Sequence, residues 1–191
     1  GHSIQIISGY EEARLIYLGV AHSLADDDDR RLVMDIGGGS TEFIIGAHFL
    51  PQQMESLHMG CVSTTQRFFA DGEITERRLR KAEIAAMREI EPIAGRYRQL
   101  GWQRLIGASG TIRAIERCLR SHGWTEGGIN PAGLAQLREA LIAAGSMQKL
   151  RLDGVSDARS EVLPGGFAVL SGAFRQLGLT HMEVSDGALR E

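Results

Sequence analysis

The sequence has few of the features that mark disulfide-rich, metal-binding or membrane proteins. It contains only two cysteines, Cys61 and Cys118, and their spacing matches neither a metal-ligand motif nor a disulfide framework. There is no run of eighteen apolar residues, and the amino terminus lacks a basic-then-apolar signal pattern. We therefore expect a soluble, cytoplasmic protein with reduced thiols and no membrane span.

An excess of charge of one sign is also missing. The net charge is −3, so the overall field does not attract DNA or a membrane surface, and local groups must hold any anionic ligand. A hydrophobic fraction of 43% with 24% charged residues is typical of a globular domain, and 191 residues suffice for one domain or one lobe of a larger enzyme. Residues 1–3 resemble a tag remnant, which leaves 4–191 as the expected domain.

Hydrophobic periodicity predicts strands that alternate with helices. The expected strands cover residues 4–7, 32–36, 43–45, 53–58, 105–106 and 182–184. The expected helices are one that begins near residue 11, a short one that ends at 69, and four over 75–100, 111–121, 131–144 and 164–177. Pro92 lies inside the longest helix, which it should kink or divide. The alternation predicts an α/β fold whose mixed sheet opens with an antiparallel hairpin.

One glycine-rich loop has the composition of a phosphate site. It reads Asp35-Ile36-Gly37-Gly38-Gly39-Ser40-Thr41-Glu42. Three successive glycines let backbone N–H groups converge on an anion, and the two hydroxyls add further donors. Asp35 and Glu42 are placed to hold a divalent cation. The alternative is an ordinary hairpin turn, since glycine clusters are also turn residues.

The elements on either side of this loop narrow its class. Strand patterns both precede and follow it, so the unit is strand–loop–strand. A nucleotide-binding P-loop or a Rossmann turn leads into a helix. The sequence therefore excludes those two common nucleotide loops.

A second loop, Gly107-Ala108-Ser109-Gly110-Thr111, joins a buried strand to a helix. The N–H groups at a helix start form a natural anion site, so Gly107, Ser109 and Gly110 are candidate phosphate contacts. A tight turn in which Ser109 caps the helix is an equally good interpretation. A third turn, Ser185-Asp186-Gly187, is a weaker candidate.

Two acidic residues, Glu11 and Glu12, begin the first helix. Hydrolysis of a phosphoanhydride needs a carboxylate that orients or deprotonates water, and either residue could serve. The competing interpretation is that both simply interact with the helix dipole. A basic cluster at Arg77, Arg78, Arg80 and Lys81 is most simply a solvated helix face, with a polyphosphate track as the minority interpretation.

Five motifs in order carry a family resemblance. They are Ile-Ile-Ser-Gly-Tyr-Glu-Glu-Ala-Arg, Asp-Ile-Gly-Gly-Gly-Ser-Thr-Glu, Met-Gly-Cys-Val, Gly-Ala-Ser-Gly-Thr and Ser-Asp-Gly-Ala-Leu-Arg-Glu. From about Ile4 to Glu191, the chain resembles the exopolyphosphatase/guanosine pentaphosphate phosphohydrolase family of the actin-like superfamily.

The resemblance implies an actin-like, ribonuclease H-like lobe that takes part in Mg²⁺-dependent hydrolysis of a terminal phosphate. It implies that Glu12 is the catalytic glutamate. Asp35 and Glu42 then surround the metal and the water, with Glu42 shared between catalysis and metal binding. Residues 37–41 form the phosphate cradle.

The resemblance also implies what is missing. The family's amino-terminal lobe and its carboxyl-terminal helical domains have no counterpart here, so we expect a second lobe with little turnover of its own. The full-length parent is expected to be a homodimer that acts on polyphosphate, with guanosine pentaphosphate as the rival substrate. A kinase or ATPase lobe and a non-catalytic phosphate sensor remain the alternatives.

Overall fold

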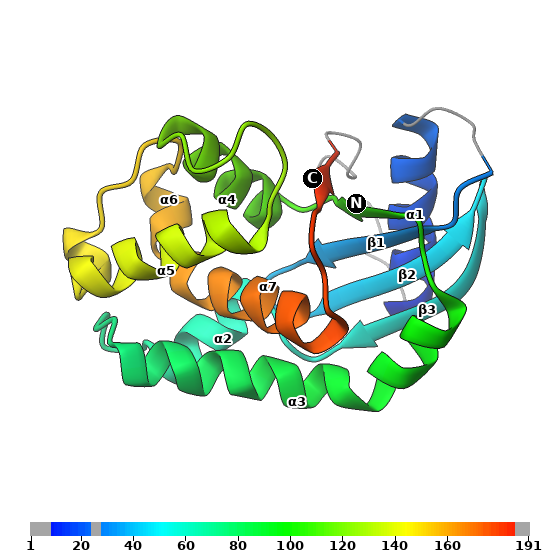
Figure 1. Cartoon of the computed structure of the whole chain (residues 1–191). Helices are drawn as coiled ribbons and strands as arrows, with labels where there is room; N and C mark the ends of the chain where they lie inside the picture. Colours follow the sequence, from blue (N-terminus) through cyan, green and yellow to red (C-terminus); the bar gives the residue numbers. More distant parts are fainter. Residues whose placement is uncertain (1–8, 24–27, 186–191) are drawn as a thin grey trace, which may run out of the picture.

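The computed structural model describes residues 9–23 and 28–185 and contains one mixed sheet flanked by helices (Figure 1). The strands are β1 (Arg31–Ile36), β2 (Thr41–Ala47), β3 (Leu50–Leu57), β4 (Arg104–Gly107) and β5 (Glu183–Val184). The helices are α1 (Gly9–Ser23), α2 (Cys61–Phe68), α3 (Glu76–Leu100), α4 (Gly110–Ser121), α5 (Pro131–Ala144), α6 (Asp157–Ser160) and α7 (Leu163–Leu177), with a 3-10 turn, η1, at Met147–Lys149. The expected strand 4–7, the tag remnant 1–3, and Asp186 and Gly187 lie outside the described residues.

The sheet has the order β3-β2-β1-β4-β5. The first three strands form an antiparallel meander, whereas β1, β4 and β5 are parallel neighbours. Both the predicted α/β class and the predicted opening hairpin are confirmed. Because β3 and β1 are each antiparallel to β2, β3 also runs in the same direction as β1.

The two faces of the sheet have different covers. Helix α1 packs on one face, where Tyr17 and Val20 meet the buried side chains of Val33, Ile44 and Ile106. The other helices cover the opposite face, around a larger core centred on α7 (Figure 1). Alternate residues of a strand point to opposite faces, so a position in β1 or β2 determines which cover its side chain meets.

Helix α3 runs unbroken through Pro92, so the proline does not divide it. Figure 1 shows the carboxyl-terminal part of α3 turning away from the rest of the helix, as a proline inside a helix causes. Helix α5 begins as predicted: the Asn130 side chain accepts a hydrogen bond from the Gly133 N–H, and Pro131 occupies the first turn. Within residues 9–23 and 28–185, no helix is long and apolar enough to cross a membrane.

Candidate functional site

Topology gathers the sequence motifs at one edge of the sheet. The carboxyl ends of β1, β4 and β5 lie at that edge because these strands are parallel. The glycine loop follows β1, the second loop begins at Gly107, and Ser185 follows β5, where its N–H donates to the Gly107 carbonyl at 2.9 Å. In α/β sheets, ligands bind beyond the carboxyl ends of the strands. We therefore expect a phosphate to bind at this edge of the sheet.

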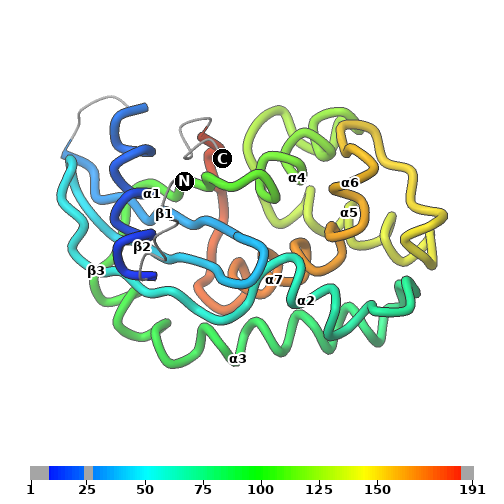
Figure 2. The backbone as a smooth tube through the Cα atoms, turned by 180° about the vertical axis from the view of Figure 1, so that it is seen from behind, coloured from blue at the N-terminus to red at the C-terminus, as the bar shows by residue number. Residues whose placement is uncertain are grey.

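The start of α2 packs against the glycine loop, which forms the turn between β1 and β2 (Figure 2). The Cys61 N–H donates to the Gly37 carbonyl at 2.9 Å, and the Val62 N–H donates to the Gly38 carbonyl at 2.9 Å. The loop's carbonyls thus point toward α2. In the described part of the chain, the N–H groups of Gly38 and Gly39 donate to no other backbone group, and both residues are exposed. This arrangement leaves N–H donors available for an anion.

Gly60 makes this close approach possible. A Cβ atom at position 60 would lie 2.4 Å from the carbonyl atoms of Gly38, too near for any side chain. The Thr41 hydroxyl adds a second tie, since it donates to the Met59 carbonyl at 2.5 Å and is fully buried. The Thr41 hydroxyl therefore stabilises the loop in this structure, and phosphate binding by Ser40 stays a prediction.

A row of polar side chains crosses the sheet beside the loop. Asp35 in β1 pairs directly with Glu42 in β2, and Glu42 pairs with Ser56 in β3. Directly opposed residues of antiparallel strands lie on one face, here the face that α1 covers. Glu42 is only 1% exposed, and the Ser56 hydroxyl donates to its Oε1 at 2.8 Å. The structure thus brings together the two carboxylates predicted to bind the metal.

The first turn of α1 lies over this row. A Cβ at Gly9 would lie 3.1 Å from the Ser56 Cβ, so the helix start is packed on β3. Burial is the main cause that raises the pKa of Glu42, and the negative charge of Glu12 raises it further. Hydrogen bonds from Ser40 and Ser56 act in the opposite direction. Glu12 is therefore near enough for its charge to act on Glu42.

Glu11 has a different neighbour. Its carboxylate accepts a hydrogen bond from Arg14 at 2.6 Å, and this bond lowers its pKa. A carboxylate engaged by a cation on its own helix is a poor base for water. The geometry thus distinguishes two glutamates that the residue pattern alone left equivalent.

The second loop serves as a helix cap. The Ser109 side chain is buried and accepts a hydrogen bond from the Ile112 N–H at 3.1 Å, and the Ala108 N–H donates to the Met34 carbonyl of β1 at 3.0 Å. Ser109 therefore caps α4, as the alternative interpretation of this loop predicted. Phosphate binding by Gly107, Ser109 and Gly110 stays a prediction.

Arg159 of α6 was missed by the sequence reasoning. A Cβ at Gly110 would lie 2.6 Å from an Arg159 guanidinium nitrogen, which places a cation beside the start of α4. Helix α6 has only four residues, too few for a periodic signal. No local pattern connects it to the glycine motif 49 positions earlier.

The magnesium site predicted at the sheet edge has two carboxylates as its protein donors. Within the described residues, no group of three or more His, Cys, Asp and Glu side chains could hold a metal ion. Mg²⁺ usually binds through one or two carboxylates together with waters and substrate phosphates. Asp35 and Glu42, opposed on adjacent strands, supply such a pair.

The described residues form an α/β lobe with a mixed five-stranded sheet and helices on both faces. The model of the Ppx/GppA phosphatase family matches residues 1–191, and the chain belongs to this family. It is 44% identical over 190 residues to a guanosine-5'-triphosphate,3'-diphosphate pyrophosphatase of Aeromonas hydrophila. That match covers 100% of this chain and 38% of the relative, so the chain spans well under half of the relative's length.

Solved structures agree on the fold. The Aquifex aeolicus Ppx/GppA phosphatase superposes with a TM-score of 0.78 at 23% identity, over 94% of this chain and 60% of that one. An exopolyphosphatase from Cytophaga hutchinsonii gives a TM-score of 0.77 at 23% identity, over 93% of this chain and 59% of the other. The expected actin-like lobe is confirmed.

Proposed function

We propose that the chain is the phosphate-binding lobe of a hydrolase that removes the terminal 5'-phosphate of guanosine-5'-triphosphate,3'-diphosphate. The 44% identity to the Aeromonas hydrophila enzyme of that name supports this substrate. The proposal reverses the order expected from sequence, which put inorganic polyphosphate first and guanosine pentaphosphate second. Both substrates carry the same reacting group, a terminal phosphoanhydride.

The observation that carries the proposal is that the start of α1 packs on Ser56, the hydrogen-bond partner of Glu42, on the sheet whose edge carries the open loop N–H groups. The charge of Glu12 in this first turn acts on Glu42. The loop and the Ser40 hydroxyl bind the terminal phosphate. Glu12 takes a proton from water, whose oxygen forms the new bond to phosphorus as the anhydride P–O bond breaks. The bridging oxygen keeps the electrons of that bond and leaves on the shortened nucleotide, and the terminal group is released as inorganic phosphate. Asp35 and Glu42 would hold a Mg²⁺, which would supply positive charge that offsets the charge of the phosphates.

The test is phosphate release by the full-length parent, because this chain spans only 38% of its relative. Replacement Glu12→Gln should lower kcat by about 10²–10⁴-fold, the usual contribution of a general base. Glu11→Gln is the matched control and should leave kcat nearly unchanged, since Arg14 engages that carboxylate. Turnover that survives Glu12→Gln would show that the base lies elsewhere.

The same assay separates the substrates. We expect kcat/KM to be higher for guanosine-5'-triphosphate,3'-diphosphate than for polyphosphate, and the opposite order would restore polyphosphate as the substrate. Calorimetry with ATP tests the kinase or ATPase alternative, which requires tight ATP binding. Phosphate binding by the wild-type parent without any release would favour the sensor.

A further inference from the structure

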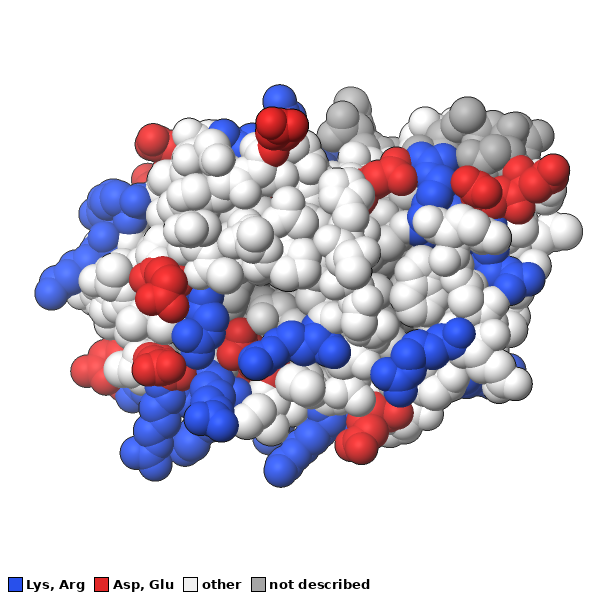
Figure 3. Space-filling model, viewed as in Figure 1, with Lys and Arg blue, Asp and Glu red and all other residues white. Residues whose placement is uncertain are grey.

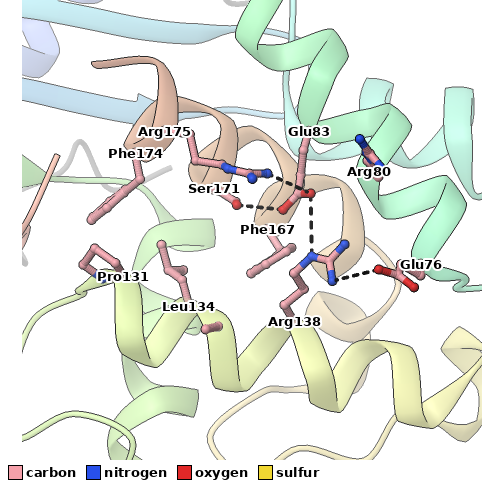
Figure 4. Close-up of a pocket in the computed structure, with 11 residues that line it drawn as sticks. Glu76, Arg80, Glu83, Pro131, Leu134, Arg138, Phe167, Ser171, Phe174 and Arg175 are labelled. Atoms are coloured by element: carbon pink, nitrogen blue, oxygen red, sulfur yellow. Dashed lines mark hydrogen bonds and ion pairs between the residues drawn. The ribbon is translucent and has the colours of Figure 1, made fainter. Parts of the chain in front are cut away.

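A cavity between α3, α5 and α7 lies away from the sheet edge. It measures about 520 Å³, within the range of small-molecule sites. Each of the three helices lines it with one face, as Figure 4 shows. None of its lining residues belongs to the glycine loop or to the polar row of Asp35, Glu42 and Ser56. The cavity is thus separate from the site of the proposed hydrolysis.

Glu83 of α3 is the buried polar group of this cavity. Its side chain is 1% exposed, and the Ser171 hydroxyl donates to Oε1 at 2.8 Å. Oε2 makes no hydrogen bond within the described part of the chain. The guanidinium nitrogens of Arg138 and Arg175 lie 3.7 and 3.6 Å away, beyond hydrogen-bond distance. A buried carboxylate oxygen requires donors, and Oε2 has only these two long ion pairs, so it is an acceptor short of hydrogen bonds.

Positive charge surrounds this acceptor. Figure 3 shows basic side chains gathered over α3 and α5, with acidic side chains between them. Arg80 lines the cavity one helical turn before Glu83 and is exposed. The Arg175 side chain is 61% exposed, and its pair with Glu83 is long. Guanidinium groups at the rim suit a phosphate, which they can bind with two parallel hydrogen bonds.

The remaining wall is apolar. Pro131 and Leu134 of α5 face Phe174 of α7 across the cavity (Figure 4). An inorganic anion would leave this wall uncovered. A ligand with an ammonium group would place a cation beside two guanidiniums. The cavity therefore calls for a neutral hydroxyl, an anion and a flat apolar part in one molecule.

We propose that this cavity binds a nucleotide at a site distinct from the hydrolytic one. A ribose hydroxyl donates to Glu83 Oε2, in the way that acidic residues bind ribose in dinucleotide sites. The phosphates accept hydrogen bonds from Arg80 and Arg175, and the base lies against Leu134 and Phe174. Each of the three kinds of lining side chain thus meets a matching part of the ligand.

Calorimetry of the 191-residue chain with ADP tests the site. Arg80→Ala should weaken ADP binding at least about tenfold, the effect of losing one charge-assisted contact. Lys81→Ala is the matched control: Lys81 is an exposed cation on the same helix that does not line the cavity, and the dissociation constant should stay within about twofold. Equal losses in both variants would mean that ADP senses only general positive charge, and the proposal would be wrong.

The ribose contact has its own test. For the wild type, 2',3'-dideoxy-ADP should bind about tenfold more weakly than ADP, because Glu83 loses its donor. Glu83→Gln should weaken ADP similarly and should bind the dideoxy compound no worse than the wild type does. If Glu83→Gln fails to fold, the comparison of the two nucleotides on the wild type still decides. Equal affinity for both would overturn the ribose assignment.

A loop variant separates the two sites. Ser40→Ala removes a hydroxyl of the glycine loop, so ADP binding in the α3–α5–α7 cavity should persist in this variant. Loss of ADP binding in Ser40→Ala, with binding kept in Arg80→Ala, would place the nucleotide at the loop and contradict the inference. No ADP binding at millimolar concentration would also contradict it.

Discussion

Glu42 and Glu83 are both 1% exposed, and in both the hydroxyl of a serine donates to Oε1 at 2.8 Å. Their other neighbours differ. Glu42 faces Asp35 across the strand pair and feels the charge of Glu12. Glu83 lies among guanidinium groups, with its second oxygen free of hydrogen bonds in the described chain.

The difference shows that burial alone does not define the chemistry of a carboxylate. At the sheet edge, negative charge is concentrated, so the site favours a proton or a cation. Between the helices, positive charge surrounds one acceptor, so the site favours an anion that carries a hydrogen-bond donor. Removing each carboxylate should therefore have different consequences for stability.

The largest expected effect comes from truncation. Glu83→Ala should lower the free energy of unfolding by about 2–4 kcal/mol, because Ser171 loses its acceptor and two cations lose their carboxylate. Glu42→Ala should cost less, since it also removes repulsion from Glu12. Urea denaturation of the two variants measures both values. A greater loss for Glu42→Ala would contradict the comparison.

The two serines provide a sharper test. Ser171→Ala and Ser56→Ala each remove one hydrogen bond to a buried carboxylate, worth about 1.5–3 kcal/mol. At Ser56 the loss should grow with pH, because the removed bond favours the ionised form of Glu42. Thermal melts between pH 4 and pH 8 report this dependence. A pH-independent loss at Ser56 would show that its bond does not hold the charged form.

The smallest expected effect is that of Glu42→Gln on stability. The pKa of Glu42 is raised in the folded protein, so the folded state binds this proton more tightly than the unfolded chain does. The free energy of unfolding of the wild type should therefore fall as the pH rises through the folded-state pKa, whereas the glutamine variant lacks this fall. We expect the Tm of the variant relative to the wild type to rise from pH 4 to pH 8. A relative Tm that decreases over this range would show that a bound cation or a stronger donor stabilises the carboxylate.

Local signals predicted much of the fold and part of the site. The glycine loop, the hairpin and the start of α5 at Asn130 each depend on neighbouring residues, which a sequence displays directly. The role of Thr41 was different: its hydroxyl faces Met59, 18 positions away, and only packing reveals that partner. Approaches such as that of Arg159 to Gly110 likewise depend on tertiary structure.

Glu83 carried a signal that could have been found. It lies four residues after Leu79 and seven before Ile90, on the apolar stripe of α3. An acidic residue within such a stripe indicates either a buried partner or a site. Its surroundings, however, come from α5 and α7, whose placement no periodicity predicts.

The close contacts of Gly60 have a consequence for how the protein tolerates mutation. Gly60 touches the backbone of Gly38, and at the next position Cys61 touches Gly165 of α7, where a Cβ would lie 2.4 Å from the Cys61 carbonyl oxygen. The backbone at the start of α2 therefore contacts the backbone of the glycine loop on one side and that of α7 on the other. Gly60 and Gly165 carry no chemical group, yet a saturation screen should find both nearly as intolerant of substitution as Glu12, because even a methyl group would separate these layers.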